Sequence, residues 1–189
     1  MFDRGLFITL EGGEGAGKST LQRALVDKLE ATGQEVVATR EPGGTPLAEA
    51  VRQLALHPPG HAWSPMAEAL LMNAARTDHL EKVIRPALDR GAWVICDRFS
   101  DSTLAYQSAG GLSMKVLKRL EKTVLDKTTP DLTLILDAPI GQLRIRRGSD
   151  SDAFEDRGME FHDSVREAFL RIAEDEPERC VLILSLIHI

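Results

Sequence analysis

A glycine-rich segment, GGEGAGKS at residues 12–19, restricts the possible folds of this chain more than any other segment. It follows a short apolar run at residues 6–11 and precedes residues 19–31, where leucines recur at every fourth position. This order fits the motif G-x-x-x-x-G-K-[ST] between a strand and a helix, where backbone N–H groups wrap around phosphate oxygens. The sequence therefore predicts a nucleoside triphosphate site at the start of a helix.

Each residue type in this loop has a physical role in holding phosphate. Glycines let the backbone approach the phosphates, and the helix N-terminus adds a positive dipole. Lys18 supplies positive charge for the β- and γ-phosphates, and Ser19 supplies a hydroxyl for Mg²⁺. We therefore expect ATP and Mg²⁺ as cofactors. The predicted nucleotide-binding residues are Gly12, Gly13, Glu14, Gly15, Ala16, Gly17, Lys18, Ser19 and Thr20.

The rest of the chain alternates apolar runs with amphipathic segments. Runs rich in Val, Ile and Leu are typical of parallel strands buried on both faces. They lie at residues 6–11, 35–39, 92–96, 132–136 and 180–189. Segments with helical spacing lie at residues 19–31, 66–88, 114–125 and 164–174. Glycine- and proline-rich stretches at residues 41–46 and 57–65 are predicted loops. This alternation predicts one α/β domain, in which helices flank a parallel sheet of about five strands.

Charge and composition exclude several functional classes. The net charge of −6 argues against a general nucleic-acid-binding surface. No run of about 18 apolar residues is present, so no membrane-spanning helix is expected, and the acidic Asp3 does not fit a secretory signal. Cys96 and Cys180 lie in apolar stretches and are expected to be buried, reduced thiols. We therefore expect a cytoplasmic protein.

Charged side chains follow two of the predicted strands. Arg40 and Glu41 follow the second strand and begin a glycine-rich turn, and Asp97 and Arg98 follow the third. Because the carboxyl ends of parallel strands form the edge where ligands bind, these residues are candidate site residues. Asp97 is predicted to hold Mg²⁺ or its waters, and Arg98 is predicted to bind phosphate oxygens.

A polar cluster follows on a predicted helix. Thr103, Tyr106 and Gln107 share a helix face, and Ser102 adjoins it. Their hydroxyl, ring and amide groups suit a base and a sugar, and a solvated polar face is the alternative. Arg76 lies in an otherwise apolar helical stripe. Taken alone, it favours a surface charge over a group that reads a base.

Together these segments resemble the bacterial thymidylate kinases. The resemblance extends from residue 6 to about residue 183, and TREPGGT and DRFSDSTLAYQ are far more specific than the phosphate loop. The matching segments are EGGEGAGKST (11–20), TREPGGT (39–45), AAR (74–76), IRPAL (84–88), DRFSDSTLAYQ (97–107), PDLTLILD (130–137) and FHDSVREAFLRIA (161–173). The resemblance implies a three-layer P-loop NTPase fold, transfer of the ATP γ-phosphoryl group to dTMP for dTTP biosynthesis, and a homodimer.

The same resemblance implies roles for individual residues. Glu14 would meet the 3′-hydroxyl of dTMP, and Tyr106 would pack on the deoxyribose side. Arg76, Thr103 and Gln107 would read the thymine. The implied substrate-binding residues are Arg40, Glu41, Arg76, Arg98, Ser102, Thr103, Tyr106 and Gln107. The predicted catalytic residues are Lys18, Arg98, Asp97, Glu14, Arg147 and Arg157, and the predicted metal ligands are Ser19 and Asp97.

The resemblance also implies a lid over the phosphates, near residues 146–157. Relatives without an arginine in the phosphate loop usually supply one from this lid, but here Ala153 stands at that position. We hypothesise that Arg147 or Arg157 supplies the charge and that the enzyme is slower than its relatives. Met72 stands where relatives often have an aromatic residue, which predicts weaker dTMP binding unless Met72 is only a core residue.

Other interpretations stay open at this point. The chain could be another nucleoside monophosphate kinase or a degenerate protein that only binds nucleotide. A GTPase-like switch is disfavoured, because residues 126–129 do not fit the guanine-reading N-K-x-D segment. The histidines have no metal-binding spacing and are expected to be solvated or capping. They are His57, His61, His79, His162 and His188.

The last six residues, LSLIHI, have an unusual character for a domain end. We expect the kinase-like domain to comprise residues 1–183, without the final helix that relatives have. Residues 184–189 are then expected to be a non-native tail that could extend the fifth strand.

Overall fold

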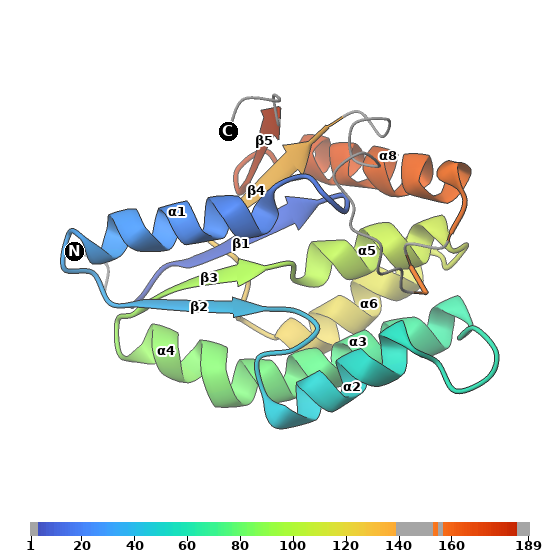
Figure 1. The fold of residues 1–189 in the computed structure, drawn as a ribbon, viewed down its shortest axis with the longest axis horizontal. Helices are drawn as coiled ribbons and strands as arrows, with labels where there is room; N and C mark the ends of the chain where they lie inside the picture. The colour runs from blue at the N-terminus through green and yellow to red at the C-terminus, as the bar shows by residue number, and fades with distance from the viewer. Residues whose placement is uncertain (1–3, 139–152, 155–156, 185–189) are drawn as a thin grey trace.

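The computed structural model describes residues 4–138, 153–154 and 157–184. Within these residues, five parallel strands form one sheet in the order β2-β3-β1-β4-β5, and helices flank it (Figure 1). The strands are β1 (Phe7–Gly12), β2 (Val36–Arg40), β3 (Trp93–Asp97), β4 (Leu132–Asp137) and β5 (Cys180–Leu184). The helices are α1 (Lys18–Glu30), α2 (Pro46–Leu56), α3 (Pro65–His79), the π-helix η1 (Leu80–Ile84), α4 (Arg85–Asp89), α5 (Ser100–Ala109), α6 (Met114–Leu125) and α8 (Met159–Asp175).

The strand order determines which face of the sheet each helix covers. From β1 the chain crosses toward one edge to reach β2, and each later crossover runs in the opposite direction. Since crossovers between parallel strands are right-handed, α1 lies on one face, and the helices of the later crossovers lie on the other. Accordingly, α1 packs against β1, β2 and β3, whereas α8 packs against β1, β4 and β5.

The strand register aligns the carboxyl ends of the three neighbouring strands β2, β3 and β1. Asp97 at the end of β3 is paired with Leu10 on β1 and with Arg40 on β2. Gly12, which ends β1, is paired with Leu136 on β4. The chain therefore brings Gly12, Arg40 and Asp97 to one edge of the sheet, and the segments that follow these residues begin there.

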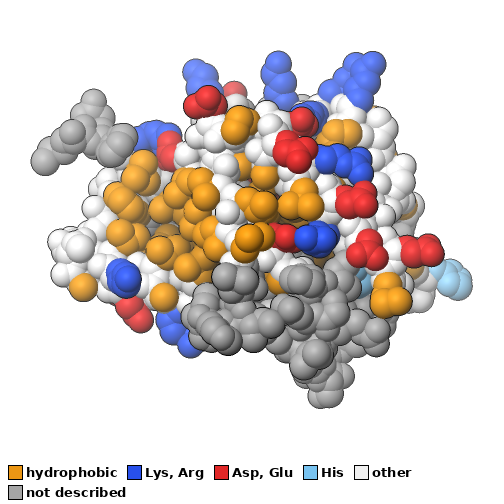
Figure 2. Space-filling view, turned by 90° about the horizontal axis from the view of Figure 1, so that it is seen from above, with side chains coloured by type: hydrophobic (Ala, Val, Ile, Leu, Met, Phe, Trp, Pro, Cys, Tyr) orange, Lys and Arg blue, Asp and Glu red, His pale blue; other side chains and the backbone are white. Residues whose placement is uncertain are grey.

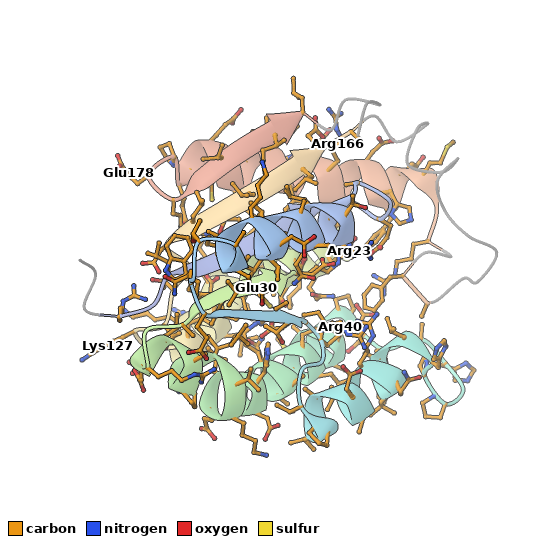
Figure 3. All side chains as sticks on the ribbon, turned by 60° about the vertical axis from the view of Figure 1, so that its left-hand side comes forward. Arg23, Glu30, Arg40, Lys127, Arg166 and Glu178 are labelled. Atoms are coloured by element: carbon orange, nitrogen blue, oxygen red, sulfur yellow. The ribbon has the colours of Figure 1, made fainter. Side chains whose placement is uncertain are left out.

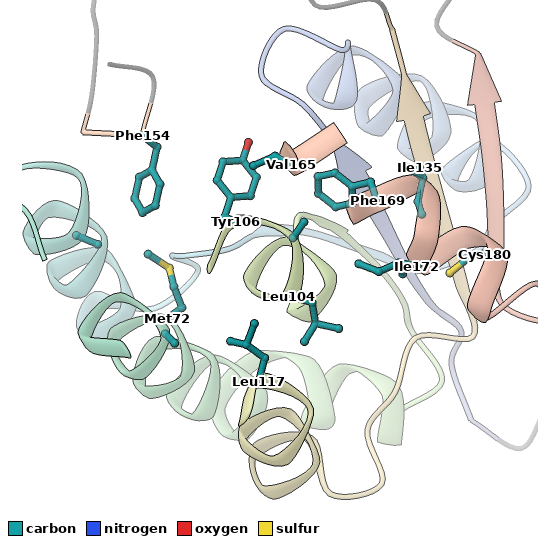
Figure 4. Packing of buried hydrophobic residues seen from close by; sticks show 13 residues of the cluster. Met72, Leu104, Tyr106, Leu117, Ile135, Phe154, Val165, Phe169, Ile172 and Cys180 are labelled. Atoms are coloured by element: carbon teal, nitrogen blue, oxygen red, sulfur yellow. The ribbon is translucent and has the colours of Figure 1, made fainter. Parts of the chain in front are cut away.

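The largest hydrophobic cluster lies between the sheet and the helices α5, α6 and α8. Leu104, Phe169 and Ile172 pack here against Ile135 of β4 (Figure 4). Tyr106 extends the cluster toward the functional edge, where its ring meets those of Phe154, Phe161 and Phe169 edge to face. The site helix α5 is therefore supported by the core along much of its length.

Cys96 and Cys180 are both buried and free, as predicted. By contrast, exposed charged side chains cover the outer surface. Arg23, Glu30, Lys127 and Glu178 are exposed, and Figure 3 shows where they lie on the ribbon. No helix among the described residues is long and apolar enough to cross a membrane.

Several elements differ from the predictions. The predicted helix 66–88 is interrupted by the π-helix η1 (Leu80–Ile84). The predicted helix 164–174 begins earlier than expected, at Met159. No element was predicted over α2, yet Thr45 caps it by accepting a hydrogen bond from the backbone N–H of Ala48 at 3.1 Å. The predicted tail contributes Leu184 to β5, and residues 185–189 lie outside the described residues.

Hydrophobic side chains also reach the surface. Val181, Leu182 and Leu184 on the edge strand β5 are 47%, 41% and 63% exposed. Figure 2 shows hydrophobic side chains gathered on the face seen from above, the side on which β5 lies in Figure 1. On the other side of the molecule, α2 and α3 expose Leu47 and Leu70.

Candidate functional site

A cavity of about 880 Å³ opens at the carboxyl ends of β1, β2 and β3. Most of the predicted site residues line it. They are Glu14, Gly15, Ala16, Gly17, Lys18, Ser19, Thr20, Arg40, Glu41, Arg76, Asp97, Arg98, Ser102, Thr103, Tyr106 and Gln107. Gly12 and Gly13 border a small neighbouring pocket, and Arg147 lies outside the described residues.

The loop between β1 and α1 forms a cradle around Lys18. Its ammonium group donates to the carbonyl oxygens of Gly12 at 3.1 Å and Gly13 at 2.8 Å. Burial and the nearby charge of Arg98 lower the pKa of Lys18 to about 8. Gly12 has a φ of 124°, and a Cβ there would collide with the carbonyl oxygen of Leu136, so the loop requires glycine at this position.

Ser19 and Asp97, the two predicted metal ligands, are neighbours. The Ser19 hydroxyl donates to Oδ2 of Asp97 at 2.8 Å. Hydroxyl and carboxylate oxygens are ligands that Mg²⁺ accepts, and Mg²⁺ is usually held by one or two protein groups together with substrate phosphates. Among the described residues, no three His, Cys, Asp or Glu side chains form a metal-binding group of their own. The donor set therefore fits Mg²⁺ bound jointly with a nucleotide.

Arg98 connects the phosphate loop to α5. It donates to the carbonyl oxygen of Gly12 at 2.9 Å, to Oγ of Ser102 at 3.1 Å and to Oε1 of Glu14 at 2.5 Å. Burial alone would lower the pKa of Arg98. The nearby Glu14, Tyr106 and Glu11 together have the larger, opposite effect, so the pKa lies above its usual value. Arg98 therefore keeps a fixed positive charge beside the phosphate loop.

Tyr106 completes this group of contacts. Its hydroxyl donates to Oε1 of Glu14 at 3.3 Å, and the guanidinium carbon of Arg98 lies 5.2 Å from the centre of its ring. Burial raises the pKa of Tyr106, so the hydroxyl stays protonated and can donate. Glu14 thus receives hydrogen bonds from two predicted site residues on different elements.

Arg76 is buried on α3, so the alternative of a surface charge is wrong. Its Nε donates to Oε2 of Glu41 at 2.7 Å, and Nη1 donates to Oδ1 of Asn73 at 3.2 Å. Nη2 donates to the carbonyl oxygen of Phe99 at 3.1 Å and to Oγ1 of Thr103 at 3.0 Å. These bonds fix the plane of the guanidinium group beside α5.

His79 is a buried site residue that the sequence pattern did not predict. It was expected to be solvated or capping, and this is wrong because its side chain is buried. Nδ1 lies 3.0 Å from Oε1 of Glu41, and Nε2 lies 2.7 Å from Oγ1 of Thr39. The spacing from Arg76 is the signal that could have revealed it, because positions i and i+3 share a helix face. Gly44 passes so close that a Cβ there would collide with the His79 ring.

Glu11 was also missed as a site residue. Its Oε1 accepts from the backbone N–H groups of Phe99 at 2.8 Å and Ser102 at 3.3 Å, and Oε2 accepts from the Ser102 hydroxyl at 2.6 Å. Burial and the nearby charge of Asp101 raise the pKa of Glu11 to about 7. This carboxyl group positions the first turn of α5, and an acidic residue inside an apolar strand was the available signal.

Arg157, a predicted catalytic residue of the lid, is linked to Gln107 through Glu68 but is not among the residues that line the cavity. It forms an ion pair with Oε1 of Glu68, and its guanidinium carbon lies 4.8 Å from the ring centre of Phe154 and 4.6 Å from that of Phe161. Oε2 of Glu68 accepts from Nε2 of Gln107 at 3.1 Å. Glu68 is buried and was not predicted as a site residue.

Comparisons with known proteins agree with this geometry. The family model for thymidylate kinase matches residues 10–186. The thymidylate kinase of Caulobacter vibrioides is 53% identical over 183 residues, which cover 95% of this chain and 88% of that protein. The thymidylate kinase of Pseudomonas fluorescens (strain Pf0-1) is 56% identical over 182 residues, 95% of this chain and 87% of that protein.

A solved structure is similar as well. The crystal structure of thymidylate kinase from Ehrlichia chaffeensis matches with a TM-score of 0.80 and 37% sequence identity. The match covers 95% of this chain and 92% of that chain.

Proposed function

The chain belongs to the thymidylate kinase family, and on that basis we propose which of its residues carry out each part of the reaction. The activity is the transfer of the γ-phosphoryl group from ATP to dTMP, which gives dTDP and ADP. The family, the P-loop NTPase fold and this activity were all predicted from the sequence and are confirmed. The observation that carries the residue assignment is that the phosphate loop and the Arg76–Thr103 pair line one cavity.

At the phosphate end, we assign Lys18 and Arg98 to the transferred phosphoryl group. Both side chains are cations, and both donate a hydrogen bond to the carbonyl oxygen of Gly12 in the phosphate loop. Phosphoryl transfer requires little covalent chemistry from the protein, which acts by positioning the two phosphates and stabilising the spread negative charge. The attacking oxygen of dTMP is already anionic, so no strong general base is needed.

We further propose that Ser19 and Asp97 hold Mg²⁺ together with the ATP phosphates. The 2.8 Å contact between the two side chains supports this assignment. When bound, Mg²⁺ supplies positive charge that neutralises the phosphate oxygens. Arg40, which lies on the cavity wall at the end of β2 (Figure 3), is assigned to the acceptor phosphate.

At the other end, Arg76, Thr103 and Gln107 are assigned to the thymine. Thr103 and Gln107 lie one turn apart on α5, and Arg76 reaches the same face from α3. Met72 also lines the cavity, where its thioether can pack against the base. Glu14 and Tyr106 are assigned to the deoxyribose, because their mutual hydrogen bond lies between the phosphate loop and the base end.

A coupled assay that follows ADP formation tests the assignment. We expect turnover with dTMP and ATP, weaker turnover with dUMP, and a loss of at least about 100-fold in kcat for Arg98→Met. If dGMP were used as well as dTMP, the assignment of the base end would be wrong. If Arg98→Met kept full turnover, the assignment of the phosphate end would be wrong.

We propose that the protein works as a cytoplasmic homodimer. Exposed apolar side chains on two adjacent helices, Leu47 on α2 and Leu70 on α3, support an interface there. Light scattering of the wild type and of Leu70→Glu tests this: a dimer that the substitution splits is expected, and an unchanged mass would contradict the interface.

A further inference from the structure

Within the described residues, the side-chain amide of Gln107 makes a hydrogen bond through its NH₂ group but not through its carbonyl oxygen. Gln107 is 1% exposed and lines the cavity from α5. Its Nε2 donates to Oε2 of Glu68 on α3 at 3.1 Å. Among the described residues, no donor reaches the carbonyl oxygen of this amide. The amide therefore has one fixed end and one end that is open to a ligand.

Glu68 determines which end is fixed. A carboxylate that pairs with an arginine has only acceptor atoms, so the NH₂ side of the Gln107 amide must face it. A flipped amide would place its carbonyl oxygen against the carboxylate oxygen in a buried environment, which is strongly unfavourable. Glu68 itself is held by Arg157, whose guanidinium group packs over the rings of Phe154 and Phe161.

The neighbouring group on α5 has the opposite polarity. Oγ1 of Thr103 accepts a hydrogen bond from Nη2 of Arg76, so its own hydrogen is left to donate. Arg76 is a donor in every state. The base end of the cavity therefore offers donors at Thr103 and Arg76 and, one helical turn away, an acceptor at Gln107.

A thymine edge matches this polarity, because its O4 accepts and its N3–H donates. A cytosine edge has the reverse polarity, because its N4 amino group donates and its N3 accepts. We propose that Glu68 is a specificity-determining positioning residue: by fixing the orientation of the Gln107 amide, it makes the site select a base with a protonated N3 over its 4-amino counterpart. This inference rests on the proposed function, in which Gln107 reads the base.

The variant Glu68→Gln tests the proposal, with 5-methyl-dCMP as the probe. This nucleotide differs from dTMP only at N3 and C4 of the base, so the ratio of the two kcat/KM values isolates that edge. A glutamine at position 68 can donate or accept, and Gln107 is then free to turn over. We expect the kcat/KM for 5-methyl-dCMP relative to dTMP to rise by about tenfold. An unchanged ratio in a folded Glu68→Gln variant would overturn the proposal.

Two further variants separate the possible explanations. Arg157→Lys changes the packing over Phe154 and Phe161 but keeps a cation beside the carboxylate, so the ratio should stay at the wild-type value whatever happens to turnover. Glu68→Ala leaves room for water that can bond to either end of the amide, and it should raise the ratio in the same direction. It also serves as the test if Glu68→Gln does not fold.

Gln107→Ala distinguishes failure of this inference from failure of the proposed function. If Gln107→Ala changes neither KM for dTMP nor the ratio, Gln107 does not read the base, and both assignments are wrong. If Gln107→Ala changes the ratio but neither Glu68 variant does, Gln107 reads the base without help from Glu68. In that case the assignment of Gln107 stands, and the role of Glu68 is refuted.

Discussion

His79 and Glu41 share a buried hydrogen bond of 3.0 Å between Nδ1 and Oε1, and the second oxygen of this carboxylate holds Arg76 at 2.7 Å. The histidine is itself fixed by Thr39, whose hydroxyl lies 2.7 Å from Nε2. A chain of contacts therefore runs from the end of β2 to the guanidinium group that we assign to thymine. The position of Arg76 depends on residues that do not need to touch the substrate.

We predict that His79→Phe raises the KM for dTMP about five- to tenfold, with a much smaller change in kcat. The substitution removes both hydrogen bonds of the imidazole, each of which contributes about 1 kcal/mol, and so loosens the Glu41 carboxylate that holds Arg76. The KM for ATP should stay constant, because the phosphate loop is untouched. Steady-state kinetics against both substrates measures this. His61→Phe is the matched control, because His61 is exposed. Equal effects on both KM values would contradict the prediction.

Lys18 gives the nucleotide-free protein a pH-dependent stability. Its pKa is lowered by burial from 10.5 to about 8. Below about pH 8, both the folded and the unfolded chain hold this proton. Between about pH 8 and 10.5, only the unfolded chain holds it, so stability rises with pH in this window. From pH 7 to 10.5, the wild type should therefore gain up to about 3 kcal/mol relative to Lys18→Met.

Urea denaturation of both proteins without nucleotide, at a series of pH values, measures this gain. Subtracting the free energy of unfolding of Lys18→Met from that of the wild type cancels the contributions of the other titrating groups. A difference that stays constant across the window would show that the Lys18 ammonium is not destabilised by burial. ATP affinity should fall over the same range, because binding must then restore the proton.

Arg179 should be important for stability rather than for catalysis. It forms two hydrogen bonds of 2.7 and 2.8 Å with Asp101, which is fully buried in the first turn of α5. Removing one partner of a buried ion pair leaves an uncompensated charge, so Arg179→Met should lower the free energy of unfolding by about 3–5 kcal/mol. Arg171→Met is the control, because the Arg171–Glu167 pair is largely exposed and should contribute less than about 1 kcal/mol.

Denaturant titration of both variants checks this prediction. The double variant Asp101→Asn/Arg179→Met should recover part of the loss, since it removes the buried charge together with its partner. A loss in Arg179→Met no larger than that in Arg171→Met would show that the Asp101 pair does not stabilise the fold.

Ala153 provides a test of the lid hypothesis. Its backbone N–H donates to the carbonyl oxygen of Leu56 at 3.2 Å. The resemblance in sequence implies an arginine at this position of the lid. If the missing charge limits turnover, Ala153→Arg should raise kcat by about tenfold or more, because a positioned arginine stabilises the transferring phosphoryl group. Ala153→Met controls for side-chain size. Turnover no faster than that of the parent would show that the missing arginine is not limiting.

The sheet could be predicted because its strands are short runs rich in Val, Ile and Leu. The helix α2 was missed because its capping signal, Thr45 followed by Pro46, lies within the stretch 41–46 that is predicted to be a loop. The π-helix η1 at Leu80–Ile84 was missed although Pro86, just beyond it, lacks a backbone N–H and so removes a helical hydrogen bond of this turn. It interrupts an apolar stripe that by itself predicts one continuous helix.

In the site, too, some residues could be predicted from the sequence and others could not. Asp97 ends β3, Arg98 follows it, and Lys18 begins α1 after the loop that leaves β1, so their place at the sheet edge follows from the motif order. Glu68 could not be predicted, because its contact with Gln107 depends on how α3 packs against α5. The contacts of His79 with Thr39 and Glu41 depend on tertiary packing in the same way, and only its i, i+3 spacing from Arg76 was available as a signal.

The crossovers that supply the two ends of the cavity lie on opposite faces of the sheet. The phosphate loop leads into α1, which packs on one face, whereas Arg76 and Gln107 come from α3 and α5 on the other. Substitutions that change the second substrate therefore need not disturb the loop that binds ATP. The binding sites for the phosphate donor and for the phosphate acceptor can therefore change separately, both in evolution and in redesign of the enzyme. The same separation explains why a phosphate loop read in isolation cannot identify the molecule that receives the phosphate.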